Sequence, residues 1–187
     1  LSKMKLHNFN SGPSILPPAV MQKAAQAIMD FEGSGLSILE IGHRTALFQD
    51  VMHEAVQSVK SLMQIGDDYE VLFLHGGATS QFMQVPMNLL DTHETAAYCD
   101  NGIWGNKALK EAANFGNIQV VTDSTANNHT RIDKNFVVDP SAKYLHFTTN
   151  NTVEGTQWHS LPNTSVPLVA DMSSDIFYAS QNFNKFS

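Results

Sequence analysis

Cysteine is scarce in this sequence, because Cys99 is the only one among 187 residues. One cysteine cannot form an intramolecular disulfide, so a disulfide-stabilised secreted scaffold is excluded and a cytoplasmic, reducing location is expected. Basic residues are also few: 11 Lys and Arg stand against 18 Asp and Glu, for a formal net charge of −7. Because no basic surplus is available to neutralise phosphates, nucleic acid is not expected as a partner.

Long hydrophobic runs are missing as well. The N-terminal stretch LSKMKLHNFNSGP has no apolar core, so neither a signal peptide nor a membrane span is expected. The eight histidines show neither H-E-x-x-H spacing nor a Cys/His cluster, so no metal site is expected. With 42% hydrophobic residues, the chain has enough apolar material to fold around a core.

One stretch, Glu70–Phe82, combines three signals. The apolar run Val71–Leu74 predicts a strand buried on both faces, and Gly76–Gly77 predicts a tight turn after it. Thr79 or Ser80 is suited to begin the following helix as its N-cap. A strand, a glycine turn and a helix start can bind an anion through free N–H groups and the helix dipole. The stretch lacks both G-x-G-x-x-G and a Gly-Lys-Ser/Thr sequence, so on its own it also fits an ordinary turn.

The rest of the chain alternates between helical and strand patterns. Periodicity predicts helices at about 17–31, 47–65 and 104–115, strands at 96–100, 118–122, 144–149 and 166–171, and an irregular segment at 123–140. Such alternation predicts right-handed βαβ units and a mostly parallel sheet, an α/β fold. We expect residues 1–16 to form an N-terminal arm and residues 17–187 to form one α/β domain.

Ligands of parallel sheets bind beyond the C-terminal ends of the strands. Four segments are expected at that edge: 76–79, 100–104, 150–152 and 171–174. Each also has a simpler interpretation. Gly76–Gly77 could be only a turn, Trp104 a core residue, Asn150–Asn151 turn residues, and Asp171 a helix cap or a solvated loop acid. Outside these segments, His43–Arg44 could be a surface pair.

Taken together, the four segments suit one planar, anionic ligand that contains a ring nitrogen. Gly76–Thr79 would bind its phosphate, Trp104 would stack on its ring, Thr152 would donate to a ring substituent, and Asp171 would face the ring nitrogen. A carboxylate beside that nitrogen favours its protonated form by charge pairing. These requirements describe pyridoxal phosphate, whose pyridinium ring is an electron sink.

Several longer stretches, in this order along the chain, resemble the N-terminal half of the phosphoserine aminotransferases, a family of fold-type I pyridoxal-phosphate enzymes. They are HNFNSGPSILP (7–17), DFEGSGLSILEIGHR (30–44), DDYEVLFLHGGATSQFMQVPMNLL (67–90), NGIWGNKALKEA (101–112), TNNTVEGTQW (149–158) and VPLVADMSSDI (166–176). The resemblance implies an αβα sandwich around a mostly parallel sheet, which is the large cofactor-binding domain of that fold type. It also implies a homodimer with its active site at the subunit interface.

The activity that the resemblance implies is transamination of 3-phosphohydroxypyruvate with glutamate to phosphoserine and 2-oxoglutarate, in serine biosynthesis and in many bacteria also in pyridoxine biosynthesis. The resemblance assigns cofactor contacts to five residues: Ala78 and Thr79 at the phosphate, Trp104 on the ring, Thr152 at the 3-hydroxyl and Asp171 at the ring nitrogen. It assigns substrate contacts to Arg44, His43 and Ser11. Some members carry Arg where this chain has Thr79, so that phosphate contact is absent here.

The lysine that forms the Schiff base lies in a Gly-x-Gln-Lys stretch in this family, and no such stretch occurs here. Lys185 matches a position before that stretch and is not assigned the role. We therefore expect the sequence to stop short of the lysine and of the C-terminal small domain, and the 187-residue chain to be inactive and prone to aggregate by itself.

Two alternatives remain open. One is another fold-type I enzyme of the same class, such as a cysteine desulfurase or an alanine–glyoxylate-type aminotransferase. A desulfurase needs a mobile catalytic cysteine, whereas Cys99 falls in a predicted strand. The other is a fragment that binds or supports structure without catalysis.

Overall fold

A computed structural model describes residues 6–186, which divide into two compact units. The first unit consists of the described residues up to Leu62 together with Gly66–Val71, and the second consists of Met63–Ile65 and the residues from Leu72 onward.

The first unit contains helix α1 (Pro18–Met29) and all of helix α2 (Ala46–Met63) except its last residue. Pro18 at the first helical position suits α1, because its fixed φ angle and missing N–H cost nothing there. The helices predicted at 17–31 and 47–65 are confirmed. Neither of these two helices has a buried residue. No helix within residues 6–186 has the length and apolar character needed to cross a membrane.

The second unit is built on a four-stranded sheet. Its strands are β1 (Thr95–Asp100), β2 (Asn117–Asp123), β3 (Leu145–Thr148) and β6 (Leu168–Asp171). They are ordered β2-β1-β3-β6 and are all parallel. The predicted α/β class with a mostly parallel sheet is therefore confirmed, and each of the four predicted strands from residue 96 onward forms within two residues of its expected bounds.

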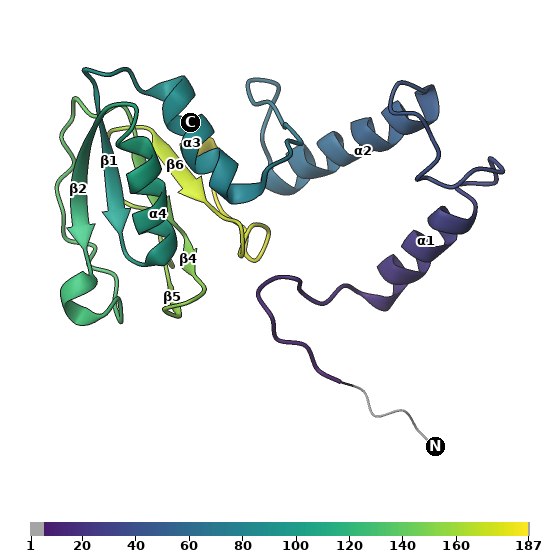
Figure 1. The fold of residues 1–187 in the computed structure, drawn as a ribbon, viewed down its shortest axis with the longest axis horizontal. Helices are drawn as coiled ribbons and strands as arrows, with labels where there is room; N and C mark the ends of the chain where they lie inside the picture. The colour runs from purple at the N-terminus through teal and green to yellow at the C-terminus, as the bar shows by residue number, and fades with distance from the viewer. Residues whose placement is uncertain (1–5, 187) are drawn as a thin grey trace. The chain divides into compact units, whose positions relative to one another are not determined.

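Two further helices, α3 (Gly77–Leu89) and α4 (Ile103–Ala112), belong to the same unit, and Figure 1 shows α4 lying across the strands. They cover one face of the sheet, where a buried cluster contains Phe82, Leu90, Ala96, Tyr98, Ala108, Ala112 and Tyr144. The opposite face carries a second cluster, which contains Ala97, Cys99, Ala142, Leu145, Phe147, Trp158, Val166 and Leu168. Irregular segments pack on this second cluster, through Ile132, Phe136, Val138 and Leu161 among others.

A short antiparallel pair follows β3. It consists of β4 (Asn150–Asn151) and β5 (Thr156–Gln157), where the sequence predicted only a turn. The remaining elements are two single-turn 3₁₀ helices, η1 (Thr125–Asn127) and η2 (Phe183–Lys185). Lys185 is exposed in η2, and Phe186 forms an isolated parallel bridge with Leu168 of β6.

The prediction that Val71–Leu74 forms a buried strand is wrong. The segment is not in a strand, and Leu72, Phe73 and Leu74 keep 70%, 55% and 56% of their surface exposed. An apolar run becomes a strand only where a neighbouring strand takes its backbone hydrogen bonds. No strand among residues 6–186 pairs with this segment, so the run has the composition of a buried strand without the partner that would make it one.

The predicted N-cap of α3 is also wrong, because the helix begins at Gly77 and its N-cap is Gly76. Thr79 and Ser80 therefore lie inside the first turn. Gly76 has a φ angle of 100°, in the left-handed region that favours glycine, and a Cβ atom there would overlap the Ser80 hydroxyl. The turn requires glycine for both reasons, and it turns the chain into the helix without a side-chain cap.

Candidate functional site

The C-terminal ends of the strands provide the frame of the predicted site. Asp171, the last residue of β6, is in register with Thr148, the last residue of β3. Asp100 ends β1 and pairs with Asp123 of β2. Because parallel strands end at the same edge of the sheet, these four polar residues lie along one edge.

Asp171 is held at this edge by its own backbone. Its carbonyl oxygen accepts hydrogen bonds from Thr149 N at 3.0 Å and from Thr149 Oγ1 at 3.1 Å. One carboxylate oxygen, Oδ1, accepts from Ser173 N at 3.1 Å and from Ser173 Oγ at 2.5 Å. The second oxygen, Oδ2, has no hydrogen-bond partner within residues 6–186, so it can accept a hydrogen bond from a ligand.

Trp104 and Thr152 are brought together from different segments. The indole Nε1 of Trp104, in the first turn of α4, donates to Thr152 Oγ1 at 3.1 Å. Since this bond uses only the acceptor capacity of the hydroxyl, Thr152 keeps its own proton for another acceptor. The ammonium of Lys107, one helical turn further on, lies 5.4 Å from the centre of a Trp104 ring, a cation–π distance. Trp104 is half-buried. Thr152 fixes the edge of its ring and Lys107 lies over one face.

The start of α3, where the sequence predicts phosphate binding, is an uncapped helix end. No side chain caps this helix, so its first N–H groups and the positive end of its dipole are available to a ligand. Ala78 packs against the same buried cluster as Trp104 and Val169, which is two residues before Asp171. Thr79 is exposed. The helix start therefore lies on the same face of the sheet as the other predicted cofactor residues.

His146 lies on the same face as the predicted site and was not named from the sequence. It lies on β3 two residues before Thr148, and its ring stacks on Tyr98 with 4.8 Å between centroids and meets the edge of Phe82. Burial lowers the pKa of His146 to about 4, and the charge of Asp171 opposes this shift. His146 is therefore neutral at pH 7. The alternation Tyr144, His146, Thr148 was the available signal, because it places all three on one face of a strand.

Asp175 is a second residue that was missed. Its side chain is buried, and its two oxygens bond to Thr149 Oγ1 at 2.5 Å and to Gln157 Nε2 at 3.1 Å. Asp175 therefore ties the turn after Asp171 to the end of β3 and to β5. Its sequence signal was weak, because an acid four residues after a strand resembles any loop acid.

Three predicted substrate residues belong to the first unit. Ser11 lies in a bend, and His43 and Arg44 occupy a turn just before α2. All three side chains are exposed. Their part in the site described in the second unit stays a prediction.

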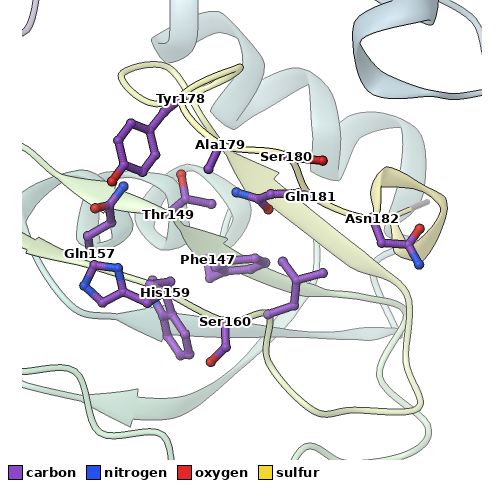
Figure 2. Close-up of a pocket in the computed structure, with 12 residues that line it drawn as sticks. Phe147, Thr149, Gln157, His159, Ser160, Tyr178, Ala179, Ser180, Gln181 and Asn182 are labelled. Atoms are coloured by element: carbon purple, nitrogen blue, oxygen red, sulfur yellow. The ribbon is translucent and has the colours of Figure 1, made fainter.

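A pocket of about 350 Å³ lies elsewhere in the second unit. Figure 2 shows its lining, with Tyr178, Gln157 and His159 on one side and Asn182 on the other. None of the predicted cofactor residues lines it. Its floor includes Phe147 of the cluster on the sheet face opposite α3 and α4, so this pocket is separate from the predicted site.

Cys99 lies inside β1, as predicted, and it is buried. Burial raises the pKa of its thiol to about 12, so the reactive thiolate is strongly disfavoured. This argues against a desulfurase-type nucleophile. Within residues 6–186, no group of three or more His, Cys, Asp or Glu side chains could hold a metal ion.

Comparison with known proteins gives consistent results. Residues 6–186 match the model of the class-V aminotransferase family. A phosphoserine aminotransferase of Phocaeicola vulgatus is 49% identical over 183 residues, which cover 98% of this chain and 51% of the relative. The one from Desulfatibacillum aliphaticivorans is 45% identical over 186 residues and is covered to 52%. The chain thus spans about half the length of the curated relatives it matches.

Solved structures agree with the sequence relatives. The phosphoserine aminotransferase of Bacillus circulans subsp. alkalophilus superposes with a TM-score of 0.90 at 40% identity, covering 96% of this chain and 50% of that one. The pyridoxal-phosphate-bound phosphoserine aminotransferase of Trichomonas vaginalis superposes with a TM-score of 0.88 at 26% identity, covering 97% and 55%. Since the family match extends over nearly the whole described chain, the chain belongs to the class-V aminotransferase family.

Proposed function

We propose that the full-length protein containing this chain is a pyridoxal-phosphate-dependent transaminase that converts 3-phosphohydroxypyruvate and glutamate to phosphoserine and 2-oxoglutarate. The observation that carries the proposal is the position of Asp171 at the end of β6, on the face of the sheet where the Trp104–Thr152 pair and the uncapped start of α3 also lie. The similarity to phosphoserine aminotransferases supports the choice of substrates.

The residues present fit pyridoxal phosphate group by group. An uncapped helix start suits its phosphate, a half-exposed indole suits its ring, and a hydroxyl with a free proton suits its 3-oxygen. The unpartnered Oδ2 of Asp171 suits the protonated ring nitrogen. The helix start, the Thr152 hydroxyl and Asp171 Oδ2 each keep an unused hydrogen-bonding capacity, and Trp104 offers a half-buried ring. Each of the four matches a different part of the same molecule.

When bound, pyridoxal phosphate supplies an electron sink for breaking the bond between the substrate α-carbon and its hydrogen. Asp171 would keep a proton on the ring nitrogen by charge pairing, which would maintain that sink. Trp104 would stack on the ring, and Thr152 would donate a hydrogen bond to the 3-oxygen. The N–H groups of Gly77, Ala78 and Thr79 would neutralise part of the phosphate charge.

The substrate groups are proposed to bind to the first unit. Arg44 would pair with the substrate carboxylate, with the Ser11 segment beside it, and His43 would lie by the substrate phosphate. The 187 residues contain no Gly-x-Gln-Lys stretch, so the attachment lysine would come from the half of the relatives' length that this chain does not cover. The isolated chain is therefore expected to be inactive.

We further infer that the full-length protein is a cytoplasmic homodimer and serves serine biosynthesis, with a second role in pyridoxine biosynthesis. A phosphate bound at the start of α3 alone would lack cationic partners, which a second subunit would supply. Sedimentation of the full-length protein tests the dimer, and a fully active monomer would contradict it.

The function is tested with the full-length protein and the variant Asp171→Asn. Removing a preorganised charge partner is expected to lower kcat/KM by roughly 10²–10³, measured as 2-oxoglutarate formed from glutamate and 3-phosphohydroxypyruvate. Asp123→Asn is the matched control, since Asp123 also ends a strand, and it should retain activity. Turnover of another keto acid, but not of 3-phosphohydroxypyruvate, would refute the substrate. Absence of transamination with every amino donor would refute the activity.

A further inference from the structure

The start of α4 carries Trp104 but has no cap of its own. Its N-cap residue, Gly102, contributes no side chain. The first N–H of the helix, that of Ile103, donates instead to Glu154 Oε1 at 2.8 Å, from a residue 51 positions away. A carboxylate at this place also interacts favourably with the positive end of the helix dipole.

Glu154 belongs to the turn between β4 and β5, and the same turn carries Thr152. This turn is therefore joined to the first turn of α4 at two points, Glu154 to Ile103 and Thr152 to Trp104. Two contacts between the same pair of segments fix an orientation, whereas one contact would leave a pivot. The side chain of Trp104 lies beside both contacts.

The carboxylate of Glu154 is also pressed against the backbone of the helix start. A Cβ atom at Gly102 would lie only 2.6 Å from Glu154 Oε2 and 3.1 Å from Asn151 Oδ1. Both of these oxygens are buried and have no hydrogen-bond partner within residues 6–186. In a solvated loop acid the second carboxylate oxygen would be exposed to water. The second oxygen of Glu154 is buried against the helix start instead, so this side chain is packed in place.

We infer that Glu154 is a positioning residue for the cofactor-binding Trp104: by capping α4 from the β4–β5 turn, it sets the place of the indole and of its Thr152 partner. The inference rests on the proposed function, because Trp104 matters only if a planar cofactor stacks on it. Glu154 touches neither cofactor nor substrate in this role and acts through the helix start.

The chemistry of the contact predicts which substitutions will be tolerated. In Glu154→Gln the amide oxygen can still accept from Ile103 N, because the side chain keeps its length and an acceptor at the same place. In Glu154→Asp the charge stays, but the side chain is shorter by one carbon–carbon bond of about 1.5 Å, too short to reach. Glu154→Ala removes the contact. The order expected is therefore Gln close to wild type, with Asp and Ala both impaired.

The first test uses full-length protein without cofactor, labelled with 5-fluorotryptophan, with the Trp104 resonance assigned through Trp104→Phe. Glu154→Ala and Glu154→Asp are expected to shift or broaden this resonance, and Glu154→Gln is expected to leave it in place. Asp139→Ala is the matched control, because Asp139 likewise caps a turn through Ser141 N and Oγ. An unchanged Trp104 resonance in Glu154→Ala would overturn the inference. If that variant does not fold, Glu154→Asp decides in the same way.

The second test measures pyridoxal phosphate binding from the visible absorbance of the cofactor in the same proteins. Loss of an ordered aromatic stack is expected to weaken pyridoxal phosphate binding roughly three- to tenfold in Glu154→Ala and in Glu154→Asp. Glu154→Gln should bind the cofactor as the wild type does. Equal binding by wild type and Glu154→Ala would overturn the positioning role. Absence of binding by the wild type would instead refute the proposed function, so the two failures can be told apart.

Discussion

The two units of this chain use their apolar residues in opposite ways. Helices α1 and α2 of the first unit bury none of their residues. The second unit buries apolar side chains on both faces of a parallel sheet, from Tyr98 and Tyr144 on one face to Leu145 and Phe147 on the other. Similar apolar periodicity thus gave a core in one unit and half-exposed helices in the other.

The difference teaches what a helix pattern implies. In α2, Leu47, Val51, Ala55, Val59 and Leu62 recur at helical spacing on one face. The first four side chains are half-buried, whereas Leu62 keeps 63% of its surface exposed. A pattern of this kind indicates that the helix has an apolar face to bury, but it does not indicate which surface will cover that face. The sheet of the second unit supplies its own partners, because each strand brings residues to both faces.

The largest effect is expected from opening the core of the second unit. Phe147 is fully buried and its ring contacts that of Trp158 at 5.5 Å between centroids. Phe147→Ala in the 187-residue chain should lower the free energy of unfolding by about 3–5 kcal/mol, through lost burial and the cavity left behind. Urea unfolding followed by tryptophan fluorescence measures it. A loss below about 1 kcal/mol would mean that this unit is no better packed than the first.

A smaller effect is expected from His146, which gives the core of the second unit its own pH dependence. The pKa of His146 is about 4 in the folded chain and about 6.5 when unfolded. Unfolding therefore takes up a proton between these pH values. The contribution of His146 to the free energy of unfolding is fully present above pH 6.5 and is lost as the pH falls toward 4. The difference of about 2.5 pKa units corresponds to about 3 kcal/mol.

Urea midpoints between pH 4 and 7 measure this contribution. In His146→Gln the pH dependence should be weaker by about that amount, whereas replacing the exposed His159 with Gln should not alter it. If both variants follow the wild-type profile, His146 is not desolvated and the site face is more open than the structure indicates.

The buried pair of tyrosines should give a still smaller effect. The hydroxyl groups of Tyr98 and Tyr144 are 2.8 Å apart within the buried cluster. Tyr98→Phe should cost about 1–3 kcal/mol, because it leaves the Tyr144 hydroxyl buried without its partner, and the double replacement Tyr98→Phe with Tyr144→Phe should be close to neutral. Thermal unfolding of the single and double variants completes the cycle. Additive losses would contradict a direct interaction.

The smallest effect is expected in the first unit. Ile28 of α1 keeps 49% of its surface exposed, and alanine is the better helix former. Ile28→Ala should therefore change the stability of the 187-residue chain by less than about 1 kcal/mol, measured by the same urea unfolding as Phe147→Ala. A loss comparable to that of Phe147→Ala would remove the contrast between the two units.

Much of the second unit could be predicted from its residues. Short apolar runs bounded by turn residues located β1, β2, β3 and β6, and the alternation with helices implied parallel pairing. Val71–Leu74 carried the same signal and failed, since pairing depends on a neighbour that the run itself does not specify. The hairpin of β4 and β5 was missed because two-residue strands carry no periodicity.

The residues of the candidate site were named from their places in the chain. Asp171 ends a strand and Trp104 begins the helix after one, and the Trp104–Thr152 bond joins two residues that were named separately. His146 and Glu154 were not found, because their importance depends on which residues face them. Glu154 is 51 positions from the N–H that it caps.

The sequence by itself determined the class of this protein: an acidic α/β chain with a glycine turn and an aspartate at strand ends, in an order that resembles one enzyme family. Those signals are local, since composition, periodicity and turn chemistry act over a few residues. Only the tertiary structure decided that Val71–Leu74 stays unpaired, that His146 lies desolvated on the face of Asp171, and that Glu154 clamps the helix of Trp104. Each of these depends on register and burial, which arise from contacts between residues far apart in the chain.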